Sequence, residues 1–100
     1  MLKAAFIFLA PQADTARHRA VVETPAVELT VVGAEDYKAA VKTAQELTAQ
    51  GVGAIELCGG FGIEGVAAIK TAVAGKAVIG AVRFDLHPGL DNKSGDAIFR

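Results

Sequence analysis

The chain alternates between continuous apolar runs and stretches in which apolar residues recur at helical spacing. Four short, largely apolar runs bounded by turn-forming residues predict strands over residues 3–10, 27–33, 52–58 and 77–84. Apolar residues every three or four positions predict helices over residues 35–50 and 63–74. Asp14 is a good N-cap residue, so residues 14–22 are expected to form a third, short helix.

The predicted order is β-α-β-α-β-α-β in a single α/β domain of 100 residues. Short alternating elements imply a four-stranded, mainly parallel sheet, like an open doubly wound sheet or half of a (β/α)8 barrel. Residues 85–100 are expected to form a polar C-terminal tail or lid. Three helices can scarcely cover both faces of a parallel sheet. We therefore expect the tail or a partner subunit to cover part of it, which makes a homo-oligomer the expected state.

Composition narrows the classes of partner. The chain is 52% apolar with a net charge of −1 and has no basic stripe, so it can bury a core and is not expected to bind nucleic acid. No run approaches the ~20 apolar residues that a membrane span requires, so no membrane partner is expected. The single cysteine excludes an internal disulfide, which suits a cytoplasmic protein.

Candidate chemistry lies where the predicted strands end. In parallel α/β sheets, ligands bind outside the carboxyl ends of the strands. His18 follows the first strand, and Cys58 ends the third. The fourth strand ends among Arg83, Asp85 and His87. The topology should bring these residues to one rim.

Glu56 and Arg83 each interrupt an apolar strand, and an isolated buried charge would be costly. If the third and fourth strands are neighbours, the two side chains can form an ion pair. One interpretation is a purely structural pair. The other is that Arg83 holds a substrate carboxylate or phosphate while Glu56 acts as an acid or base.

The glycine-rich loop "CGGFG" precedes the helix over residues 63–74, so its backbone N–H groups can face an anion at the helix N-terminus. The candidate ligand-binding residues are Gly59, Gly60, Phe61 and Gly62. A tight structural turn is the alternative. The letters G-x-G-x-x-G occur in "GFGIEG" but follow the third strand, which argues against a dinucleotide site.

Cys58 could be a nucleophile because a helix N-terminus follows it, or simply a small buried residue. His87 and His18 could be acid–base groups or surface-loop histidines. Asp85, His87 and Cys58 lack any standard metal-ligand spacing, so neither a metal nor another cofactor is expected.

The chain also resembles two known families. The segments "KAAFIFLAPQAD", "IELCGGFGIEGV" and "VRFDLHPGLDNKSGD" resemble a family of small bacterial proteins of about this length that carries only a domain-of-unknown-function label. That resemblance covers nearly the whole chain and implies no activity. Residues 39–58 also resemble a helix–strand unit of barrel aldolases of the keto-deoxy-phosphogluconate type, in which a glutamate matching Glu56 is the acid–base group. Those enzymes need a Schiff-base lysine on a later strand, and residues 77–84 contain none.

These observations predict a small anionic metabolite bound at the strand ends, with Glu56, Asp85, His87 and Cys58 as acid–base or nucleophilic candidates for lyase or isomerase chemistry. The alternative is a non-catalytic binding, regulatory or assembly subunit in which Glu56 and Arg83 are structural. Whether the protein is an enzyme stays open. A cysteine- or metal-dependent enzyme is a third possibility.

Overall fold

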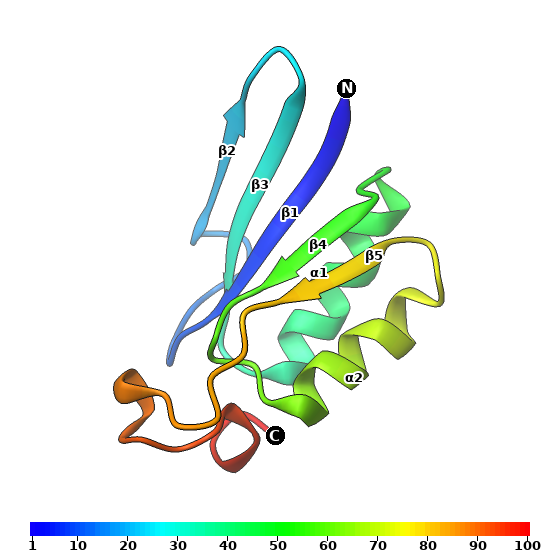
Figure 1. The fold of residues 1–100 in the computed structure, drawn as a ribbon. Coiled ribbons are helices and arrows are strands. Elements are labelled where there is room, and N and C mark those ends of the chain that lie inside the picture. The colour runs from blue at the N-terminus through cyan, green and yellow to red at the C-terminus, as the bar shows by residue number, and fades with distance from the viewer.

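A five-stranded sheet forms one layer of the domain. The computed structural model describes residues 1–100. The strands are β1 (Leu2–Leu9), β2 (Arg19–Glu23), β3 (Val27–Ala34), β4 (Ala54–Leu57) and β5 (Val78–Ala81). Their order in the sheet is β2-β3-β1-β4-β5 (Figure 1). All neighbours are parallel except β2, which pairs antiparallel with β3 at the sheet edge.

The predicted helix over residues 14–22 is wrong. The Asp14 carboxylate does accept hydrogen bonds from the N–H groups of Ala16 and Arg17, at 2.8 and 3.1 Å, but only a turn follows. The chain then becomes β2, because Val21 and Val22 favour a strand and β3 offers a free edge for pairing. The sheet is therefore mixed and five-stranded rather than four-stranded and parallel.

The half-barrel alternative is also wrong, because β1 lies between β3 and β4. In a barrel each strand would neighbour the next along the chain.

Two helices form the second layer. They are α1 (Tyr37–Ala49) and α2 (Ile63–Val73), close to the predicted ranges. Asp36 caps α1 by accepting a 2.9 Å hydrogen bond from the N–H of Ala39. Both helices lie on the same side of the sheet (Figure 1). Neither is long and apolar enough to cross a bilayer.

The core lies between these layers. Alternate strand residues, among them Ile7, Val32, Ile55 and Leu57, are buried beneath the helices. No helix covers the opposite face. Right-handed crossovers place a helix on one face or the other according to the direction in which the chain moves across the sheet. The connections from β3 to β4 and from β4 to β5 move in one direction, and the connection from β1 to β3 moves in the other, so a helix there would have covered the open face. The connection between β1 and β3 instead contains β2, which joins the edge of the sheet and covers neither face.

The C-terminal tail folds against the carboxyl-end side of the domain (Figure 1). It contains two short 3₁₀ turns, η1 (Pro88–Leu90) and η2 (Gly95–Ala97). Phe99 joins the core beside Tyr37, with ring centroids 6.5 Å apart, whereas Ile98 stays half exposed. Tail residues therefore pack at the start of α2 and leave the open face of the sheet uncovered.

Candidate functional site

The glycine loop and the tail meet beyond the carboxyl ends of β1 and β4. The ring of Phe84 lies directly against Gly59, so closely that a Cβ at Gly59 would overlap it. Phe84 in turn packs on His87, with ring centroids 4.7 Å apart. Gly95 lies against the carbonyl of Gly60. The tail thus fills much of the rim at which the sequence predicts a ligand.

The N-terminus of α2 already holds an anion supplied by the chain. The carboxylate of Asp96 accepts hydrogen bonds from the N–H of Glu64, at 3.2 Å to each oxygen, and from the N–H of Gly65 at 3.4 Å. A carboxylate at this position satisfies helix donors that have no intrahelical acceptor and interacts well with the helix dipole. An internal aspartate therefore occupies the helix N-terminus, and its donors are Glu64 and Gly65 rather than the loop residues Gly59–Gly62.

A hydrogen-bond relay connects this cap to α1. The N–H of Gly62 donates to the Tyr37 hydroxyl at 2.9 Å, and that hydroxyl donates to Asp96 Oδ1 at 2.8 Å. Burial, reinforced by the neighbouring carboxylate of Asp96, raises the pKa of Tyr37, so the phenol stays protonated. Partial burial opposes ionisation of Asp96, but the hydrogen bonds from Tyr37, Glu64 and Gly65 outweigh it and lower the pKa of Asp96.

The predicted Glu56–Arg83 ion pair is wrong. The neighbour of Glu56 in the β4–β5 register is Gly80, and β5 ends at Ala81, before it reaches Arg83. Arg83 instead donates from Nε to Asp85 Oδ1 at 2.9 Å, and both side chains are exposed. Glu56 is exposed on the open face of the sheet, opposite Phe6 in the β1–β4 register. The two charges therefore have separate surroundings.

The side chains of Cys58, His87 and His18 accept hydrogen bonds from backbone N–H groups. Cys58 is half-buried, and its Sγ accepts hydrogen bonds from the N–H of Leu9 at 3.4 Å and of Gly60 at 3.2 Å. His87 Nδ1 accepts from the N–H of Gly89 at 3.0 Å, and His18 Nδ1 accepts from the N–H of Asp14 at 2.8 Å. No three His, Cys, Asp or Glu side chains lie close enough together to hold a metal ion.

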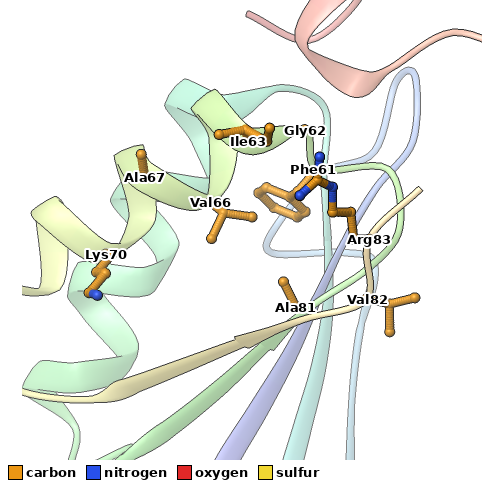
Figure 2. A pocket seen from close by; sticks show the side chains of 9 residues that line it. All are labelled: Phe61, Gly62, Ile63, Val66, Ala67, Lys70, Ala81, Val82 and Arg83. Carbon is orange, nitrogen blue, oxygen red and sulfur yellow. The ribbon is translucent and has the colours of Figure 1, made fainter. Parts of the chain in front are cut away.

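Several cavities border the strand ends, and the one between α2 and β5 is a cavity that the sequence interpretation missed. We call it the α2–β5 groove. It has a volume of about 450 Å³, within the range of small-molecule sites. Figure 2 shows α2 forming one wall and the end of β5 with the residues after it forming the other. The lining residues are Phe61, Gly62, Ile63, Val66, Ala67, Lys70, Ala81, Val82 and Arg83.

Chemically, the groove is an apolar trough with two cations. Phe61 is buried, whereas Ile63 is 62% exposed. Lys70 makes no ion pair. A sequence signal did exist, because Ile63, Val66, Ala67 and Lys70 form a stripe at helical spacing beside the buried stripe of Gly65, Ile69 and Val73. Of the predicted site residues, Phe61, Gly62 and Arg83 reach this groove, and the others do not.

Comparison with known proteins identifies a family and no activity. No curated protein and no solved structure matches the sequence. Nothing in the comparisons supports the local resemblance to barrel aldolases, and the strand order also argues against it. A family model matches residues 2–97, nearly the whole chain. The protein therefore belongs to the family of unknown function DUF6506.

Proposed function

We propose that the α2–β5 groove binds a small molecule that has an apolar body and one anionic group, a carboxylate or a phosphate. The observation that carries the proposal is the pairing of an apolar trough with Lys70 and Arg83, which lie towards opposite ends of it in Figure 2. A ligand that buries its apolar part in the trough can place its anion beside either cation.

The charge of the lining supports an anion. Lys70 and Arg83 are the only charged residues that line the groove. Arg83 contacts Asp85 through Nε, and its terminal nitrogens make no hydrogen bond. An ion pair this exposed contributes little free energy, so a ligand carboxylate or phosphate can compete with Asp85 or bind beside it. The planar guanidinium can bind either group with two parallel hydrogen bonds.

The proposal is for binding rather than catalysis. Glu56, Cys58, Asp85 and His87 do not line the groove. The N–H groups of Gly62, Glu64 and Gly65 already donate within the protein. Acid–base chemistry at these residues therefore gains no support from the groove, whereas the apolar walls and cations support recognition.

A thermal-shift screen with matched ligands tests the proposal. Cyclohexanecarboxylate and phenyl phosphate should raise the Tm in a concentration-dependent way, as any ligand of the native state does. Cyclohexanecarboxamide has a similar shape and no charge, so it should raise the Tm less. Titration calorimetry on the best anion then gives its Kd.

Three variants locate the site. Lys70→Gln and Arg83→Gln should each weaken binding of the anion by about 3- to 10-fold, the loss of an exposed charged contact. Lys76→Gln removes the same charge outside the groove and should bind like the wild type. Equal binding of acid and amide, or equal weakening by Lys76→Gln, would contradict the proposal, as would the absence of any Tm shift at about 10 mM anion, a concentration above the typical range for such sites.

A further inference from the structure

The open face of the sheet is defined by strand register. Residues paired across neighbouring strands point to the same side, so Phe6, Phe8, Val22, Leu29, Val31 and Val78 share the face that no helix covers. Every strand position on this face is apolar or glycine, with the single exception of Glu56. Val22 is 54% exposed and Val78 is 72% exposed. The face of a sheet that is exposed to water normally carries polar residues, whereas this face is almost entirely apolar.

We infer that a second copy of this chain packs face to face on the open face. The extent of the face is adequate. β1 and β3 each have eight residues. With roughly 3.3 Å per residue and about 4.8 Å between strands, the five strands offer on the order of 450 Å² of plane. Two copies would together bury about twice that area, and the uneven surface of the side chains adds to it. The total approaches the ~1,000 Å² expected of a specific interface.

The shape of the open face is complementary to the open face of a second copy. On the β5 side, no atom lies within 4 Å of a Cβ built at Gly80. A cavity of about 170 Å³ lies there, beside Glu56 and Phe6. On the β2 side, Val22 projects from the opposite edge of the sheet. β1 is the middle strand, so a two-fold axis along it would place β2 of one copy over β5 of the other. The strand register then sets Ala20 over the hollow at Gly80 and packs the exposed Val22 against the exposed Val78.

Charge also favours a copy over an oppositely charged partner. One carboxylate on a whole sheet face gives a basic partner little to recognise. The same two-fold axis places β4 over the β3 of the other copy, which keeps the two Glu56 side chains apart. Glu56 is the group that opposes the packing, because covering its carboxylate removes water from a charge. Replacing it with a neutral residue should strengthen the dimer.

Two adjacent valines provide a matched test. Val21 and Val22 are 51% and 54% exposed on the same edge strand, but they point to opposite sides of it. Val22→Glu should weaken the dimer by more than about 10-fold, whereas Val21→Glu should leave it unchanged. Sedimentation velocity from about 1 to 100 µM, a range that covers ordinary dimer affinities, should show the wild type reaching twice the 10.3 kDa of one chain. Glu56→Gln should shift the midpoint to a lower concentration.

Several outcomes would overturn the inference. A wild type that stays at 10.3 kDa throughout would do so. So would equal effects of Val21→Glu and Val22→Glu when circular dichroism shows both variants folded. Monomers that bind lipid vesicles through this face would assign it to a membrane surface instead. Lys70→Gln and Arg83→Gln should not alter the mass, so this test and the anion-binding test can fail separately.

Discussion

The hydroxyl of Tyr37, at the start of α1, donates a 2.8 Å hydrogen bond to the carboxylate of Asp96, 59 residues later in the tail. The same carboxylate caps α2 through Glu64 and Gly65. One short contact therefore joins both helices and the C-terminal tail. It also explains why the α2 N-terminus offers no vacant anion site.

Tyr37→Phe should lower the free energy of unfolding by about 1–3 kcal/mol. The buried N–H of Gly62 would lose its acceptor, and Asp96 would lose a donor. The stacking of ring 37 on Phe61, with centroids 5.7 Å apart, should persist because the ring is kept. Urea unfolding followed by circular dichroism measures the change. A variant as stable as the wild type would show that the relay contributes nothing.

Asp96→Asn should lower the free energy of unfolding at pH 7 by about 1 kcal/mol, the usual contribution of a charged helix cap. Folding lowers the pKa of Asp96 below its ordinary value of 3.8. Its contribution is therefore complete above that value and is lost as the pH falls through the folded-state pKa. The free energies of unfolding of the wild type and of Asp96→Asn should therefore become equal by about pH 3 or below. A difference independent of pH would argue that shape, rather than charge, matters at this position.

Gly95→Ala should be severely destabilising, by more than about 2 kcal/mol, because a Cβ there would overlap the backbone carbonyl of Gly60. The backbone of Gly60 cannot move aside as a flexible side chain could. Gly53→Ala is the matched control, since no atom lies within 4 Å of a Cβ built at Gly53. Its effect should stay within about 0.5 kcal/mol. Differential scanning calorimetry of Gly95→Ala and Gly53→Ala gives the two Tm values. Equal values would contradict close packing of the tail on the glycine loop.

Phe99→Ala should lower the free energy of unfolding by about 3 kcal/mol, as expected for deletion of a buried aromatic ring. Ile98→Ala is its neighbour control. Ile98 is half exposed, so its truncation should cost less than about 1 kcal/mol. Limited proteolysis provides a second measurement, because release of the tail in Phe99→Ala should expose residues 85–100 to cleavage. Unchanged protection would indicate that Phe99 does not hold the tail.

Local chemistry along the chain was enough to specify most of the secondary structure. The apolar runs that become β1, β3, β4 and β5, the two helices and the membership of a family could all be predicted from the sequence. Periodicity over a few residues is enough for these features, since each strand or helix repeats its own pattern.

The remaining features depended on the folded arrangement of the whole chain. Residues 19–23 became a strand because β3 offered an edge, an interaction that a local helix cap at Asp14 cannot reveal. The N-terminus of α2 binds the carboxylate of Asp96, 32 residues beyond Glu64. Arg83 does not pair with Glu56, because β5 ends at Ala81, before Arg83. Contacts between distant residues depend on where the whole chain places them, and spacing along the sequence carries no record of that. The same placement left one apolar sheet face open and formed the α2–β5 groove.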